Sequence, residues 1–148
     1  PTNLYGPNDN FCLETGHVMA SLIMKAHNAK KRHDSKFEIW GTGQPKREFL
    51  FVNDMADACI FLLEHYSSDE IINIGSGSEI SIMDLARLVS KTIGFDGKIV
   101  LDTSKPDGTP RKLLDSNKLK NIGWSSTTSL IEGINNTYAW YLKNMAIN

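Results

Sequence analysis

The chain has 148 residues, which is the size of one ordinary domain and too short for two. Its 41% hydrophobic and 22% charged residues are typical of a globular protein and exclude a collagen-like or wholly disordered chain. Sixteen basic against seventeen acidic residues give a net charge of -1, so we expect no nucleic-acid partner.

The apolar runs, the N-terminal residues and the cysteines indicate the cellular compartment that we expect for this chain. The longest apolar run, at 58–63, is far shorter than the roughly 20 residues that a bilayer span needs, so we expect no membrane helix. Residues 1–7 contain neither an initiator Met nor a leader, which predicts a cut chain rather than a natural start or a secretory signal. Cys12 and Cys59 lie far apart and suit two reduced thiols in a cytoplasm better than a disulfide.

The first half of the chain predicts a strand tail at 1–4, a helix and two further strands. Apolar residues recur at helical spacing between 16 and 31. Residues 37–40 alternate between polar and apolar, and 48–52 form a more apolar strand. Either Asn53 or Asp54 is expected to cap the next helix. The apolar face of that helix is predicted to contain Met55, Ala58, Cys59, Leu62 and Leu63.

The second half predicts two more strands, at 71–74 and 98–101, and two helices. Each helix begins with a capping box, and the boxes are Ser81 with Asp84 and Ser129 with Glu132. Gly94 is placed to end the first of these helices. Residues 102–111 are too rich in Pro, Gly and Asp for regular structure and predict a loop. Strands alternating with helices indicate an α/β fold with a partly parallel sheet.

Several motifs of known sites are absent from the sequence. Gly75-Ser76-Gly77 follows a predicted strand, but Ile80 stands where a dinucleotide fingerprint needs its third Gly, which favours a plain turn. None of the four Tyr residues is followed four positions later by a Lys, so the reductase pair Tyr-x-x-x-Lys is missing. The four His residues lack ligand spacing, and we expect no metal site.

A few side chains are candidates for ligand contact, each with a structural alternative. Arg47 can bind a carboxylate or phosphate with its guanidinium, or be a solvated surface residue. Trp40 can stack on a nucleobase, or belong to the core. Asp107 and Arg111 can bind a sugar and a phosphate, or form a surface turn. The residues alone leave both readings open.

Five segments taken in order resemble the GDP-L-fucose synthases, a family of extended short-chain dehydrogenases/reductases. These segments are PTNLYGP, GHV, WGTG, REFLFVNDMA and KPDGTPRK. The resemblance runs from Pro1 to Trp140-Tyr141, and residues 102–115 are its most specific part. It implies an NADPH-dependent enzyme that epimerises and then reduces GDP-4-keto-6-deoxy-D-mannose to GDP-L-fucose, with NADP(H) bound on a Rossmann domain.

The resemblance also implies roles for individual residues. It places His17 as the general acid of the epimerisation, beside the cofactor. The strand end lining the nicotinamide would consist of Pro1, Thr2, Asn3 and Leu4. The GDP-sugar would be bound by Lys25, Trp40 on the guanine, Arg47 on the diphosphate and Asp107 on the nucleoside. Lys25 follows His17 by eight residues, which predicts nearly the same helix face.

The family's glycine-rich loop, its Ser and Tyr-x-x-x-Lys residues and its catalytic Cys are not in this sequence. We therefore expect residues 1–148 to be a single C-terminal substrate-binding region, with the last strand and helix elements of the Rossmann sheet and without the NADP-binding half. Such a chain alone should not transfer hydride. The helix at 55–63 and the strand at 71–74 would then lack partners, which predicts dimerisation, swapping or marginal stability, and the intact enzyme is expected to be a homodimer. The alternatives are a non-catalytic GDP-sugar binding module and a related nucleotide-sugar epimerase or dehydratase.

Overall fold

The computed structural model describes residues 1–13 and 15–145. The larger sheet contains β1 (Asn3–Tyr5), β3 (Lys46–Phe51), β4 (Glu79–Ser81) and β6 (Arg111–Lys112), and the smaller sheet contains β2 (Lys36–Trp40) and β5 (Lys98–Asp102). The helices are α1 (Val18–Lys31), α2 (Val52–His65), α3 (Ile82–Ile93), α4 (Asn117–Asn121) and α5 (Leu130–Asn144). The predicted α/β class with parallel strands is confirmed.

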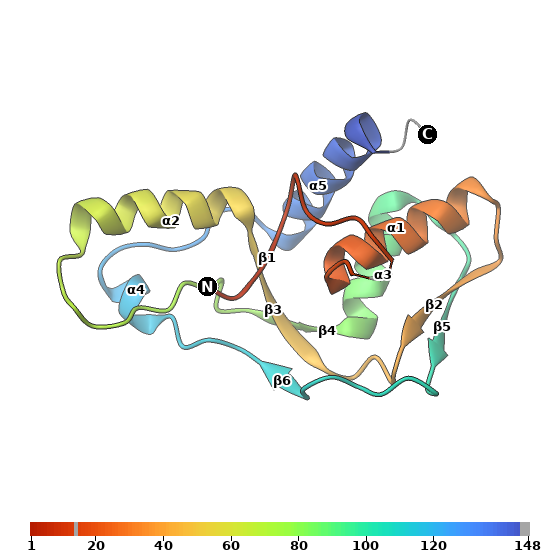
Figure 1. Cartoon of the computed structure of the whole chain (residues 1–148), viewed down its shortest axis with the longest axis horizontal. Coiled ribbons are helices and arrows are strands. Elements are labelled where there is room, and N and C mark those ends of the chain that lie inside the picture. The colour runs from red at the N-terminus through yellow and green to blue at the C-terminus, as the bar shows by residue number, and fades with distance from the viewer. Residues whose placement is uncertain (14, 146–148) are drawn as a thin grey trace.

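Strand β3 organises the larger sheet because three other strands pair with it. Its second half pairs in parallel with β1, from Asn3 opposite Phe49 to Tyr5 opposite Phe51. Its first half lies between antiparallel β4 and parallel β6. The smaller sheet is a parallel pair of β2 and β5. In Figure 1, α2 and α4 lie on one side of β1 and β3, and α1, α3 and the smaller sheet lie on the other side.

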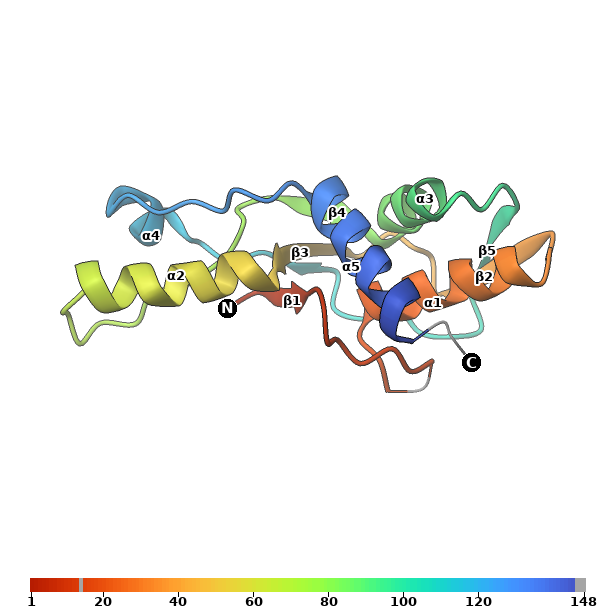
Figure 2. The ribbon, with the colours of Figure 1, turned by 90° about the horizontal axis from the view of Figure 1, so that it is seen from above.

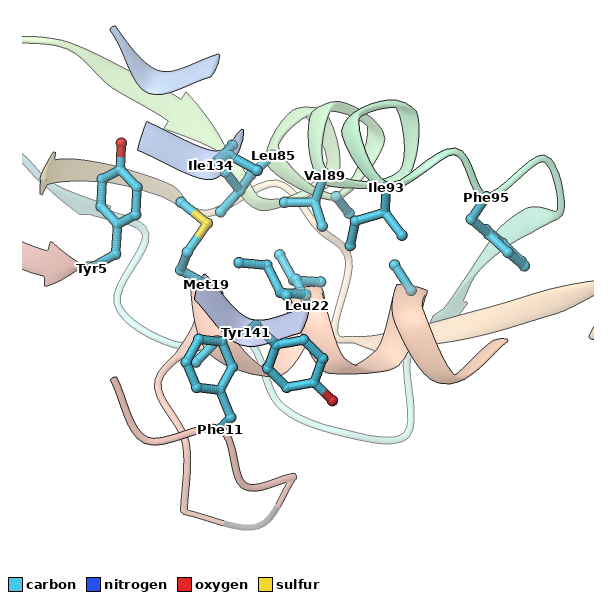
Figure 3. Packing of buried hydrophobic residues seen from close by; sticks show 14 of the residues in the cluster. Tyr5, Phe11, Met19, Leu22, Leu85, Val89, Ile93, Phe95, Ile134 and Tyr141 are labelled. Carbon is cyan, nitrogen blue, oxygen red and sulfur yellow. The ribbon is translucent and has the colours of Figure 1, made fainter. Parts of the chain in front are cut away.

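The main hydrophobic core lies among α1, α3, α5 and the neighbouring strands (Figure 3). Figure 2 shows α5 crossing between the sheet and α1. Gly133 of α5 lies directly against the buried Tyr5, because a Cβ there would be 2.0 Å from the Tyr5 Oη. Burial raises the pKa of Tyr5, with Asp54 and Glu132 adding to the effect, so this hydroxyl stays protonated. Because Tyr5 occupies the space that a side chain at position 133 would need, this helix position requires a glycine.

The serine cap of each predicted capping box is confirmed. The Ser81 hydroxyl accepts a hydrogen bond from the Asp84 amide at 3.0 Å, and the Ser129 hydroxyl accepts one from the Glu132 amide at 3.3 Å. Gly94 ends α3 in the left-handed conformation, with φ of 73°. Local sequence signals therefore placed the ends of α3 and the start of α5 correctly.

The strand predicted at 71–74 does not form. Within this segment the Ile74 carbonyl accepts a backbone hydrogen bond from Thr2, and Ile71 is 91% exposed. No described strand runs beside these residues to complete a ladder, and apolar composition alone cannot supply one. The chain pairs a few residues later instead, where β4 meets β3.

The start of α2 differs from the prediction, and its apolar face is only partly covered. The helix begins at Val52 after Phe51, with no side-chain cap, so Asn53 and Asp54 lie inside it. Of the five residues predicted to share the apolar face, Ala58 is fully buried, whereas Cys59 is exposed and Leu63 is 87% exposed. The reason is that α2 packs against a small second core only. That core consists of Leu50, Ala58, Ile74, Leu119 and Trp124.

No helix in the described part of the chain combines the length and the apolar composition that a membrane crossing needs.

Candidate functional site

Lys25, Trp40, Arg47 and Asp107, the four residues expected to bind a nucleotide sugar, line one cleft of about 310 Å³. We call it the substrate cleft. They come from α1, the end of β2, the start of β3 and the loop after β5. Apolar side chains share its wall, including Val18, Leu22, Ile39 and Ile82. An apolar wall with a few polar groups is the usual composition of a small-molecule site.

Trp40 presents its indole ring at the edge of this cleft and is 59% exposed. The Lys25 ammonium lies 5.2 Å from the ring centroid and donates a hydrogen bond to the Glu38 carbonyl at 3.0 Å. Burial lowers the pKa of Lys25, although Glu38 and Asp102 act in the opposite direction. An exposed indole beside a fixed ammonium offers a stacking surface and a positive charge to the same ligand.

Arg47 is half-buried on β3 and supplies a second positive charge. Its Nη1 donates to the Lys46 carbonyl at 2.7 Å, and its guanidinium forms no ion pair with any residue that the structure describes. Gly108 brings the loop close, since a Cβ there would lie 3.0 Å from Arg47 Nη2. A guanidinium without a carboxylate partner in a cleft can bind a phosphate.

Asp107 holds the loop of residues 103–110 against the turn after β2. Its Oδ1 accepts from the Thr42 amide at 2.8 Å, and its Oδ2 accepts from the Thr42 hydroxyl at 2.7 Å. Gly41 permits this approach, because a Cβ there would lie 2.1 Å from Asp107 Oδ1 and its φ is 75°. Each oxygen keeps a lone pair for a ligand, so the predicted nucleoside contact stays a prediction.

Two hydrogen bonds from Thr42 hold the pKa of Asp107 below its usual 3.8. The bond from the Thr42 hydroxyl has the larger effect, and the bond from the Thr42 amide adds to it. The anchor is therefore present above pH 3.8 and is lost as the pH falls through the lower pKa of the folded protein. Replacing Thr42 by Val removes the hydroxyl donor, and we expect the NMR titration midpoint of the Asp107 carboxyl to rise. Asp102, whose pKa Ser104 lowers, serves as the internal control and should not move. An unchanged Asp107 midpoint would contradict the assignment.

A second cleft of about 450 Å³ contains all five residues expected beside a cofactor. We call it the cofactor cleft. These residues are Pro1, Thr2, Asn3, Leu4 and His17. The side-chain amide of Asn3 and the hydroxyl of Thr2 both donate to the backbone carbonyl of Glu48, which fixes this strand end on β3. No Lys or Arg lines this cleft among the described residues.

The two clefts meet at the start of α1. Gly16 and Val18 line the substrate cleft, and His17, which lies between them, lines the cofactor cleft. His17 is the residue before α1 and is exposed. The expectation that His17 and Lys25 share one helix face is wrong in detail, because His17 precedes the helical backbone and lies in the neighbouring cleft. Its two sequence neighbours thus line the substrate cleft, whereas His17 itself lines the cofactor cleft.

Sequence reasoning missed Glu48, which is completely buried on β3. Its Oε1 accepts from the Gly77 amide at 2.7 Å, and its Oε2 accepts from the Leu114 amide at 3.0 Å. This carboxyl group therefore joins the turn before β4 and the segment after β6 to the strand that carries Arg47. An acidic residue within an apolar strand was the available signal.

Asp54 has a similar joining role on α2, where its carboxylate accepts from the amide and hydroxyl of Thr128 and from the Thr127 hydroxyl. The described residues contain no group of three or more His, Cys, Asp or Glu side chains arranged to hold a metal ion.

Comparison with known proteins gives one family and close relatives. The NAD dependent epimerase/dehydratase family matches residues 1–75. GDP-L-fucose synthase 1 of Arabidopsis thaliana is 55% identical over 145 residues, which cover 98% of this chain and 45% of that protein. GDP-L-fucose synthase of Escherichia coli strain K12 is 43% identical over 155 residues, which cover 97% of this chain and 48% of that protein.

A similar solved structure is that of a GDP-L-fucose synthetase from Naegleria fowleri bound to NADP. It superimposes with a TM-score of 0.93 and 33% identity, covering 99% of this chain and 46% of that one. The chain thus spans about half the length of the relatives that it matches.

Proposed function

Because the chain belongs to the NAD dependent epimerase/dehydratase family, we propose that it is the C-terminal, substrate-binding part of a GDP-L-fucose synthase. In this proposal the whole enzyme uses NADPH to epimerise and reduce GDP-4-keto-6-deoxy-D-mannose. The substrate cleft binds the GDP-sugar, and the cofactor cleft lines one side of the nicotinamide. The NADP-bound relative supports the cofactor, and the names of the sequence relatives support the substrate.

One observation carries the proposal. Residues far apart in the sequence, at positions 25, 40, 47 and 107, converge on one cleft that offers an aromatic ring and two cations. A GDP-sugar has the complementary groups, which are a flat base and a diphosphate with two negative charges. Arg47 would contact the diphosphate with two parallel N–H donors, and Trp40 would stack on the guanine.

The chemistry assigned to this chain concerns binding and one proton. When bound, NADPH supplies the hydride that reduces the ketone. His17 lies where the two clefts meet, so an imidazolium there can give its proton to a sugar carbon next to the ketone during epimerisation. Lys25 is fixed by the Glu38 carbonyl, which holds its charge in the substrate cleft.

We expect the full-length protein that carries this sequence to bind GDP at least about 10-fold more tightly than UDP, because a purine overlaps an indole more fully than a pyrimidine does. Replacing Trp40 by Ala should remove most of this preference, whereas replacement by Phe should keep much of it. Titration calorimetry with both nucleotides measures the affinities.

As a control for general damage, Trp140 can be replaced by Phe, since its ring stacks on Phe11 away from both clefts. This variant should bind like the parent. Equal GDP affinity in the parent and the Trp40→Ala protein would refute the proposed base site. GDP binding without NADPH consumption on the keto-sugar would favour a binding module, and a different product would indicate another nucleotide-sugar enzyme.

A further inference from the structure

Asp102 is the partner of Trp40 in the smaller sheet. The two residues are opposite each other in the parallel pairing of β2 and β5. Residues paired across neighbouring strands place their side chains on the same face of a sheet, so the Asp102 carboxylate lies beside the Trp40 indole. A flat ligand stacked on that indole would therefore have an acidic group at its edge.

The Asp102 carboxylate is held in one orientation by Ser104. Its Oδ1 accepts from the Ser104 hydroxyl at 2.6 Å and from the Ser104 amide at 3.1 Å. Its Oδ2 accepts no hydrogen bond from any residue in the described ranges. The bonds from Ser104 lower the pKa of Asp102, so the group is an ionised acceptor at neutral pH. One oxygen is thus fixed, and the other has both lone pairs available.

Lys105 lies over the same ring, with its ammonium 5.8 Å from the Trp40 centroid. The Lys105 ammonium forms no hydrogen bond or salt bridge within the part of the chain that the structure describes, unlike Lys25, which the Glu38 carbonyl holds. A base stacking on Trp40 can therefore displace Lys105 at the cost of one exposed cation–π contact.

We propose that Asp102 determines the base specificity of the substrate cleft, its Oδ2 accepting hydrogen bonds from the N1–H and 2-amino groups of a guanine stacked on Trp40. The inference rests on the proposed GDP-sugar site and adds a residue that distinguishes the base. Guanine carries these two donors side by side on one edge. Adenine has an acceptor at N1, and the N3–H of uracil lies between two carbonyl acceptors, so a carboxylate favours neither. Hypoxanthine keeps the N1–H donor and lacks the amino group.

The test compares GDP, IDP and XDP, the diphosphates of guanosine, inosine and xanthosine, by calorimetry on the full-length protein. The parent should prefer GDP over XDP by about 10-fold or more, with IDP between them, because a matched pair of base contacts discriminates on this scale. Asp102→Asn converts one acceptor to an amide donor that matches the 2-oxo group of xanthine. This variant should bind GDP at least about 10-fold more weakly and should reverse the preference toward XDP.

Asp96→Asn is the matched control, because Asp96 is an exposed aspartate in the turn between α3 and β5 and, unlike Asp102, is not paired with Trp40. It should bind all three nucleotides like the parent. Equal loss of GDP and XDP in the Asp102→Asn protein, or an unchanged preference for GDP, would overturn the role of Asp102. A parent that binds no guanine nucleotide would instead defeat the proposed function. The parent's ratio of GDP to IDP affinity tests the same contact without any substitution, and a ratio of one would refute it.

Discussion

Replacing Glu48 by Ala is expected to lower the free energy of unfolding by about 2–4 kcal/mol, since two backbone amides lose their acceptor at about 1 kcal/mol each and a cavity opens in the space of the buried side chain. The donors are the amides of Gly77 and Leu114. The Glu48 side chain is completely buried, whereas Gly77 is exposed and Leu114 is half-buried. Chemical denaturation measures the loss, and amide hydrogen exchange should show the two segments opening first.

Glu48→Gln tests the contribution of the hydrogen bonds while keeping the volume of the side chain. The amide keeps one acceptor but turns a donor toward one of the two N–H groups, so we expect a loss of about 2 kcal/mol without a cavity. Glu64→Ala on the exposed face of α2 is the control and should stay within about 0.5 kcal/mol of the parent. A loss below 1 kcal/mol for Glu48→Ala would mean that the two amides find other partners.

Replacing His17 by Gln is expected to lower the rate of epimerisation in the full-length enzyme by about 100-fold or more, the usual contribution of a general acid. Glutamine can still donate a hydrogen bond, but it cannot give up a proton at neutral pH. Because His17 is exposed, the substitution leaves no buried group unpaired, and NADPH binding should survive. Deuterium exchange from solvent into the keto-sugar measures the proton step, and NADPH absorbance measures the reduction.

His65→Gln is the control for this substitution, since His65 ends α2 and lines neither the substrate nor the cofactor cleft. It should leave both steps unchanged. Normal deuterium exchange in the His17→Gln protein would remove His17 from the proton transfer. Loss of NADPH binding with normal exchange would give His17 a role in holding the cofactor only.

The sequence predicted local features well where the cause was local. The two serine caps, the Gly94 stop and the helical period of α1 depend on residues within a few positions of each other. The strand expected at 71–74 failed because a strand needs a neighbour, and pairing is decided by segments far away in the chain. How much of the apolar face of α2 is covered also depends on distant segments, since burial depends on what packs against a helix.

Candidate site residues could be selected from the sequence by resemblance, but their arrangement could not. The residue types of Trp40, Arg47 and Asp107 left ligand contact and structural roles open, and the resemblance assigned them to a GDP-sugar. That they line one cleft, and that His17 lies in the next, depends on the pairing of β2 with β5 and on the bonds from Thr42 to Asp107.

Composition and short-range spacing thus determined the fold class and several element ends, whereas the candidate ligands followed from the family resemblance. The tertiary structure alone decided that Glu48 is buried, that Asp107 anchors a loop and that Asp102 stands beside Trp40. The physical reason is how far apart in the sequence the interacting residues lie. Helix periods and caps act between residues that are close in the chain, whereas burial, strand partners and cleft walls are set by residues that meet only after the chain has folded.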